Sequence, residues 1–168
     1  MKKYLKWIGL GLLAVLLIMQ FFQISKTNPA IVAEQDFINI HKPSAEVTKM
    51  LKAACYDCHS HETKYPWYTY TNPLAYWIKN HIVEGREELN FSTWATYSAK
   101  KADHKLEECV EKVIEKKMPL SSYTITHGDA KLTEPQIKQL AEFFNSLRQG
   151  KGTESKGNVE HEEEEDND

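Results

Sequence analysis

Apolar residues recur at intervals of three and four residues through the middle of this chain, which is the spacing of one face of an α-helix. Ser44 predicts the start of the first such segment, and the capping-box pattern Thr133-Glu134-Pro135-Gln136 predicts the start of the last. No segment has the alternation of a half-buried strand. We therefore predict an all-α domain over residues 44–149. Its helices are expected at residues 44–54, from 73 to about 85, at 98–117 and at 133–149.

The N-terminal segment indicates the compartment in which the domain lies. Residues 7–24 carry no charged side chain, and as a helix they would be about 27 Å long, close to the ~30 Å hydrocarbon core of a bilayer. Lysines precede them, as on the cytoplasmic side of a membrane helix. We expect residues 1–24 to be a single transmembrane signal-anchor in the bacterial inner membrane, residues 25–43 a tether, and the domain to lie in the periplasm. The alternative is a cleaved signal peptide and secretion to the periplasm.

Charge is distributed unevenly along the chain, whose formal net charge is −3. Residues 25–149 contain sixteen basic and sixteen acidic side chains, so the domain lacks the positive excess that binding to a phosphate backbone needs. We therefore expect no nucleic acid among its partners. Residues 150–168 carry eight acidic side chains against two lysines and few apolar ones, which predicts a disordered acidic tail.

Cys55, Cys58 and His59 form a C-x-x-C-H motif, the attachment signature of c-type haem. In such proteins the two thiols add across the haem vinyl groups, and the adjacent histidine is the proximal iron ligand. Three other interpretations compete: a thioredoxin-like redox pair, a zinc site with His59 or His61, and a short disulfide. A redox pair needs a βαβ context, and structural zinc usually needs a second ligand pair. The sequence has neither.

Three phrases of the sequence together resemble one known family. They are CYDCHSHETKYPWY from Cys55, EGREELNFSTW from Glu84 and MPLSSYT from Met118. The chain from Cys55 to Leu132 thus resembles the bacterial haem-binding domain family of membrane-tethered proteins. The resemblance implies one covalent haem c on Cys55 and Cys58, with His59 on the iron. More distantly, the layout is similar to class I cytochromes c, whose first and last helices cross.

Met118 is the candidate for the distal iron ligand. It follows His59 by 59 residues, enough for the chain to pass around a haem and return to its opposite face. Pro119 is expected to stop the preceding helix, and the irregular loop that follows suits the presentation of a side chain. Small c-type cytochromes place their ligand methionine in a similar Met-Pro setting. If Met118 only fills the core, the sixth position is open or belongs to His81, His104 or His127.

Two further groups of residues have more than one interpretation. Arg86 either pairs with a haem propionate or belongs to a solvated, charged turn. Cys109 is expected to be a buried free thiol on the apolar face of its helix. Six aromatic residues are expected in the core or in the wall of a haem pocket: Tyr65, Trp67, Tyr68, Tyr70, Trp77 and Trp94.

These features predict an electron carrier rather than an enzyme. One motif means one haem, and an iron with both axial positions filled has no open site for a substrate. We expect one-electron transfer between redox partner proteins of the periplasm or inner membrane. The sequence has no constellation for hydrolysis and no glycine loop for phosphate. The alternative is a sensor or catalytic module that binds O₂, NO or peroxide at an open sixth position.

Overall fold

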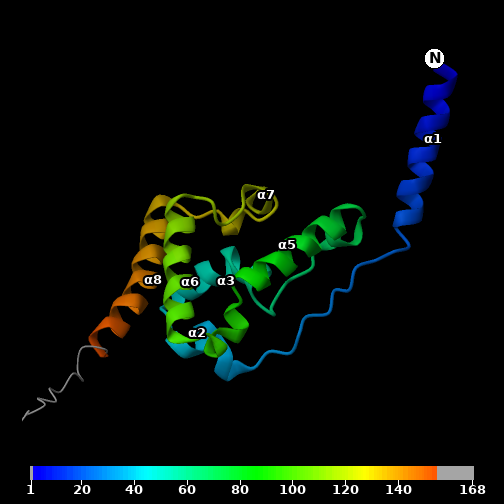
Figure 1. Ribbon diagram of the computed structural model, residues 1–168. Coiled ribbons are helices and arrows are strands. Elements are labelled where there is room, and N and C mark those ends of the chain that lie inside the picture. Colours follow the sequence, from blue (N-terminus) through cyan, green and yellow to red (C-terminus); the bar gives the residue numbers. More distant parts are fainter. Residues whose placement is uncertain (1, 155–168) are drawn as a thin grey trace, which may run out of the picture. The chain divides into compact units, whose positions relative to one another are not determined.

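The computed structural model describes residues 2–154 of the chain. Over these residues every regular element is a helix, so the predicted all-α class is confirmed (Figure 1). The chain divides between Tyr97 and Ser98 into two compact units, which are described separately below. This boundary falls inside the domain predicted for residues 44–149.

The N-terminal helix, α1 (Lys2–Met19), ends five residues before the predicted span does. Among the described residues, none of the helices has the length and apolar character needed to cross a membrane. The charge-free part of α1 starts at Trp7 and is about 20 Å long, well below the ~30 Å of a hydrocarbon core. The predicted transmembrane signal-anchor over residues 1–24 is therefore wrong. Single-pass anchoring in the inner membrane is wrong for the same reason.

Contacts with a distant loop explain why α1 stops at Met19. The Asn72 side chain donates hydrogen bonds to the carbonyl oxygens of Met19 (2.6 Å) and Phe22 (2.9 Å). The Gln20 side chain accepts from the Asn72 backbone N–H and donates to its carbonyl oxygen. The chain therefore leaves the helix at residue 20, and Ile24 is buried.

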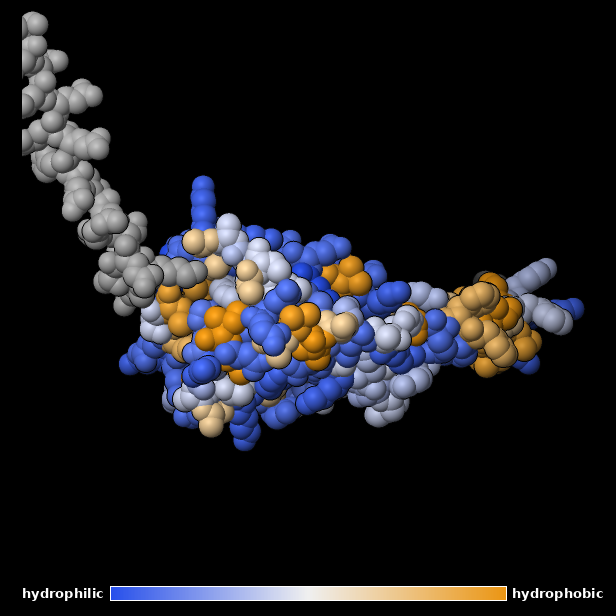
Figure 2. Space-filling model, turned by 90° about the horizontal axis from the view of Figure 1, so that it is seen from below, coloured by the Kyte–Doolittle hydropathy of each residue, from blue (hydrophilic) through white to orange (hydrophobic). Residues whose placement is uncertain are grey.

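The apolar side chains of α1 gather in one dense group on the surface (Figure 2).

The segment predicted as a tether, residues 25–43, contributes to the core of the first unit. It contains the short helices η1 (Ala33–Gln35) and α2 (Phe37–His41). Phe37 is fully buried, and its ring centroid lies 5.0 Å from that of Phe91 and 4.8 Å from that of Trp94. These three rings are the centre of an aromatic cluster in the first unit.

The remaining helices of the first unit surround the C-x-x-C-H motif. The helix α4 carries the motif and contacts α3, α5 and η3. As predicted, α3 starts after Ser44, whose hydroxyl accepts a hydrogen bond from the Val47 N–H. The helices are α3 (Ala45–Ala54), α4 (Tyr56–His59), η2 (Trp67–Tyr70), α5 (Leu74–Glu88) and η3 (Phe91–Thr96).

The second unit is built on two long helices, α6 (Ala99–Ile114) and α8 (Glu134–Glu154), which pack side by side (Figure 1). Arg148 joins them through bonds to Asp103 (3.3 Å) and Glu107 (2.9 Å). In the sequence, the connection from α6 to α8 contains α7 (Ser121–Thr124) and η4 (Gly128–Ala130). Each long helix buries apolar residues at helical spacing: Ala102, Leu106 and Val113 in α6, and Leu140, Ala141 and Phe144 in α8.

Two boundaries of the second unit differ from the predictions. The predicted stop at Met118-Pro119 is wrong, since α6 ends at Ile114. Lys116 adopts a left-handed conformation (φ 56°), and the N–H of Lys117 bonds back to the carbonyl oxygen of Lys112, an ending that closes a helix without a proline. The helix α8 continues to Glu154, and the rest of the predicted disordered tail lies outside the described residues.

Candidate functional site

The motif occupies a single helical turn. Cys55 ends α3, where its N–H bonds to the carbonyl oxygen of Leu51 at 3.0 Å. The Cys55 carbonyl oxygen then accepts hydrogen bonds from the N–H groups of Cys58 (3.3 Å) and His59 (3.0 Å). Both thiols and the imidazole are thereby carried by one rigid turn at the end of an amphipathic helix.

The imidazole of His59 is held by the last turn of α5. Its Nδ1 lies 2.8 Å from the carbonyl oxygen of Gly85 and 3.1 Å from that of Leu89. Carbonyl oxygens only accept hydrogen bonds, so Nδ1 is the protonated nitrogen. The lone pair of the neutral ring is then on Nε2. An Nδ1–H bonded to a backbone carbonyl is the arrangement that orients a histidine for a metal ion at Nε2.

Gly85 is the point where α5 approaches the motif most closely. A Cβ atom added there would lie 3.0 Å from the carbonyl oxygen of Cys58 and 3.3 Å from its Cβ. Any larger side chain would push α5 away from α4. The glycine therefore sets the distance at which α5 presents its carbonyl oxygen to His59.

The environment of the two motif thiols disfavours a thioredoxin-like function. Burial, with the neighbouring Cys58 as a smaller cause, raises the pKa of the Cys55 thiol to about 12. Burial and the negative charge of the nearby Asp57 raise the pKa of Cys58 to about 11. The positive charge of Arg86 lowers this pKa by a smaller amount. Reactive cysteines of redox pairs have lowered pKa values, because the thiolate is the nucleophile. These two thiols have the opposite shift.

The zinc interpretation gains no support from the placement of ligands. Within residues 2–154, no three histidine, cysteine or acidic side chains lie together as a metal-binding group. His61, one of the suggested ligands, is engaged elsewhere: its Nδ1 lies 3.0 Å from the carbonyl oxygen of Ala30, and the Asn90 amide donates to its Nε2 at 3.0 Å.

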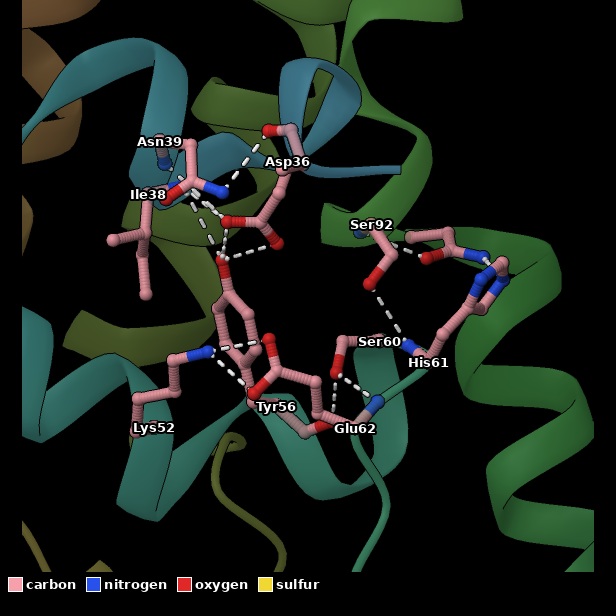
Figure 3. Close-up of polar contacts among 11 residues, drawn as sticks. Asp36, Ile38, Asn39, Lys52, Tyr56, Ser60, His61, Glu62 and Ser92 are labelled. Atoms are coloured by element: carbon pink, nitrogen blue, oxygen red, sulfur yellow. Dashed lines mark hydrogen bonds and ion pairs between the residues drawn. The ribbon is translucent and has the colours of Figure 1, made fainter. Parts of the chain in front are cut away.

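A buried polar pair anchors the motif to the segment before α2 (Figure 3). The hydroxyl of Tyr56 donates to the carboxylate of Asp36, with oxygen separations of 3.2 and 3.3 Å. Both residues are almost fully buried, and the ring of Tyr56 stacks on Phe91 at 5.3 Å. Asp36 also caps α2 by accepting from the N–H groups of Ile38 and Asn39. Burial and the charge of Asp36 raise the pKa of Tyr56, so the phenol remains protonated.

The chain after the motif is fixed by serines (Figure 3). The Ser60 hydroxyl donates to the carbonyl oxygen of Tyr56 (2.7 Å) and accepts from the Glu62 N–H (2.9 Å). The Ser92 hydroxyl accepts from the N–H of His61 at 2.9 Å. Ser60 and Ser92 are fully buried. No local pattern in the sequence indicated either contact, because the partners are brought together by the fold.

Arg86 lies in α5 and holds the loop that follows the motif, so the interpretation as a solvated turn is wrong. Its Nε donates to the carbonyl oxygen of Ser60 at 2.8 Å. Its Nη2 donates to the side chains of Asn28 (3.0 Å) and Thr63 (2.9 Å). The guanidinium therefore ties three segments of the first unit together.

The predicted distal ligand and most of the aromatic residues are not part of this core. Met118 is half-buried and belongs to the second unit. Trp94 is buried as predicted. Trp67, Tyr70 and Trp77 expose 80%, 58% and 47% of their surface, so the expectation of a protein core is wrong for them.

The other histidines proposed for the iron have contacts of their own. The His104 imidazole lies 3.9 Å from Glu107 and 3.6 Å from Glu108. His127 stacks on Tyr123 with ring centroids 3.9 Å apart. The Nδ1 of His81 bonds to the carbonyl oxygen of Trp77. Cys109, predicted to be buried on the apolar face of its helix, is only half-buried in α6.

Comparison with known proteins agrees with the chemistry of the motif. Residues 14–146 match the haem-binding domain family, Haem_bd. No curated protein and no solved structure matches the chain. The family match covers more than half of the chain and extends from α1 into α8. The chain therefore belongs to the haem-binding domain family, and haem is its cofactor.

Proposed function

We propose that this protein is a c-type haem protein that transfers single electrons between redox partner proteins. Membership of the family supports a binding or carrier function and leaves catalysis possible. The observation that carries the finer proposal is the hydrogen bond from Nδ1 of His59 to the carbonyl oxygen of Gly85. It orients the imidazole beside two cysteines at the spacing used for covalent attachment.

The side chains of the motif have distinct roles in this proposal. On haem binding, Cys55 and Cys58 would each add their sulfur to one carbon of a haem vinyl group, and the thiol proton would go to the other carbon. His59 would hold the iron through Nε2. When bound, haem supplies a reversible one-electron change of its iron. The contacts of Tyr56 and Ser60 hold the turn so that the three side chains keep their relative positions.

Met118 remains the proposed distal ligand. A thioether is a soft ligand that favours ferrous iron and raises the reduction potential relative to a second histidine. The His81 alternative has less support, because α5 contacts His59 from the Nδ1 side while the iron lies at Nε2. His104 and His127 remain alternatives.

The test of this assignment is Met118→Ala in the haem-loaded protein, followed by near-infrared magnetic circular dichroism and potentiometry. We expect the sulfur-to-iron charge-transfer band to disappear and the potential to fall. An unchanged spectrum and potential would show that Met118 only packs. His104→Ala and His127→Ala, examined in the same way, would then identify the ligand.

Covalent attachment is tested by expressing the full chain with a cytochrome c maturation system. The wild type should retain haem in a denaturing gel and give the pyridine haemochrome spectrum of two thioether bonds. Cys55→Ala with Cys58→Ala should lose covalent haem, whereas Cys109→Ala, which changes the cysteine outside the motif, should keep it. A haem-free wild-type product from cells that mature other c-type cytochromes would contradict the proposal.

The second candidate function is a module that binds a small ligand at an open sixth position. It differs from the electron carrier in coordination number. A six-coordinate, low-spin spectrum in both redox states with little CO binding supports electron transfer. A high-spin haem that binds CO rapidly would favour the sensor or catalytic module.

A further inference from the structure

The half-buried guanidinium of Arg86 is a fixed positive charge close to the motif. The preceding residue, Gly85, accepts a hydrogen bond from His59. The Nε of Arg86 donates at 2.8 Å to the carbonyl oxygen of Ser60, the residue that directly follows His59. The two bonds from Nη2 to Asn28 and Thr63 fix the plane of the group. Arg86 is therefore positioned from three sides rather than extended into solvent.

All three acceptors of Arg86 are uncharged: a backbone carbonyl, an amide oxygen and a hydroxyl. Other cations of the chain bond to carboxylates instead, as Arg148 does with Asp103 and Glu107. In the part of the chain that the structure describes, Arg86 forms no ion pair with an acidic side chain. A half-buried cation bonded to neutral groups keeps most of its field, because less water surrounds it than surrounds a surface charge.

We propose that Arg86 is a redox-tuning residue that favours the reduced state of the haem. The inference rests on the proposed attachment of haem to this motif. One electron from a redox partner converts Fe(III) to Fe(II), and no bond is formed or broken. The positive charge of the iron falls by one, so a nearby fixed cation repels the reduced state less than the oxidised state.

The expected size follows from Coulomb's law. At an effective dielectric constant of about 20, two unit charges on the order of 10 Å apart interact strongly enough to change an equilibrium roughly tenfold. Arg86→Gln should thus lower the ratio of reduced to oxidised haem, at the midpoint potential of the wild type, by about tenfold. This corresponds to a midpoint about 59 mV lower for a one-electron couple.

Two substitutions separate the charge of Arg86 from its hydrogen bonds. Arg86→Lys keeps the positive charge and loses the planar set of donors. Asn28→Asp keeps an acceptor for Nη2 but loses the bond from the Asn28 amide to the carbonyl oxygen of Thr63. It places a negative charge next to the guanidinium, which cancels most of its field. If charge sets the potential, Arg86→Lys should resemble the wild type and Asn28→Asp should resemble Arg86→Gln.

The experiment is an equilibrium redox titration of the full-length, haem-loaded variants, with pyridine haemochrome spectra to establish that haem is attached. Lys64→Gln is the matched control, since it removes one exposed positive charge from the loop that Arg86 holds and should leave the midpoint unchanged. Should Arg86→Gln fail to fold, Asn28→Asp tests the same charge effect.

Two results would overturn the proposal while leaving the proposed function intact. One is an unchanged midpoint in Arg86→Gln or Asn28→Asp with haem attached. The other is an equal fall in Arg86→Lys and Arg86→Gln, which would make Arg86 a structural clamp only. A wild-type protein without covalent haem would instead contradict the proposed function itself.

Discussion

Replacing Gly85 by alanine tests how tightly α5 must approach the motif. The added Cβ would meet the carbonyl oxygen of Cys58 at 3.0 Å and its carbonyl carbon at 3.4 Å. Both are backbone atoms of the short helix α4, which cannot rotate aside as a flexible side chain would. We therefore expect α5 to shift outward and to lengthen the 2.8 Å bond between its Gly85 carbonyl oxygen and His59.

Three contributions set the expected change in the free energy of unfolding. Overpacking of a close contact costs about 1–3 kcal/mol. Weakening the hydrogen bond to the imidazole costs up to about 1 kcal/mol. The higher helix propensity of alanine offsets about 1 kcal/mol of this. We expect Gly85→Ala to be less stable than the wild type by roughly 1–2 kcal/mol.

Urea unfolding followed by far-ultraviolet circular dichroism measures this difference. Gly11→Ala is the matched control, because Gly11 lies inside α1 and an added Cβ would have no atom within 4 Å. That variant gains helix propensity without a clash and should not be destabilised. A Gly85→Ala protein as stable as the wild type would refute the argument that this approach fixes the position of α5 against α4.

Three further predictions concern the side chains of the motif. Tyr56→Phe should lower the free energy of unfolding by about 1–2 kcal/mol, because the buried carboxylate of Asp36 loses a donor; an unchanged urea midpoint would contradict this. Before haem is attached, Cys55 and Cys58 should react with iodoacetamide at about pH 8 more slowly than in the urea-unfolded chain, because burial raises both pKa values. Since the folded state then keeps thiol protons that the unfolded chain releases, the free energy of unfolding should fall as pH rises from about 9 to 11. Equal alkylation rates in the folded and unfolded chain would contradict the raised pKa values of the two thiols.

Local signals in the sequence were sufficient for the helix starts. The Ser44 hydroxyl caps α3, and the Gln136 side chain accepts from the Thr133 N–H before α8, as the capping patterns predicted. The helix ends were less predictable. The contact of Asn72 with Met19 that closes α1 joins residues 53 positions apart, so no window of sequence around the helix contains it.

The site shows the same difference between local patterns, which the sequence reveals, and contacts between distant residues, which it does not. The spacing of Cys55, Cys58 and His59 is a local pattern, and it led directly to haem. The acceptors of the imidazole are 26 and 30 residues away, and the carboxylate that accepts from the Tyr56 hydroxyl is 20 residues away. A glycine followed by a charged residue is typical of a turn, which is why the sequence did not show that Gly85 and Arg86 pack on the motif from within a helix.

The hydrogen-bond acceptors of His59 allow one more prediction about the two candidate functions. Gly85 and Leu89, which orient its Nδ1, belong to the first unit, whereas Met118 belongs to the second. Loss of the Met118 thioether therefore leaves the cysteines and the proximal imidazole intact. We expect Met118→Ala to retain covalent haem at the level of the wild type and to bind CO in its reduced form. Loss of haem in this variant would contradict that reasoning, because attachment would then depend on Met118. If Met118→Ala binds CO, the bond between Met118 and the iron is what distinguishes an electron carrier from a ligand-binding protein in this chain.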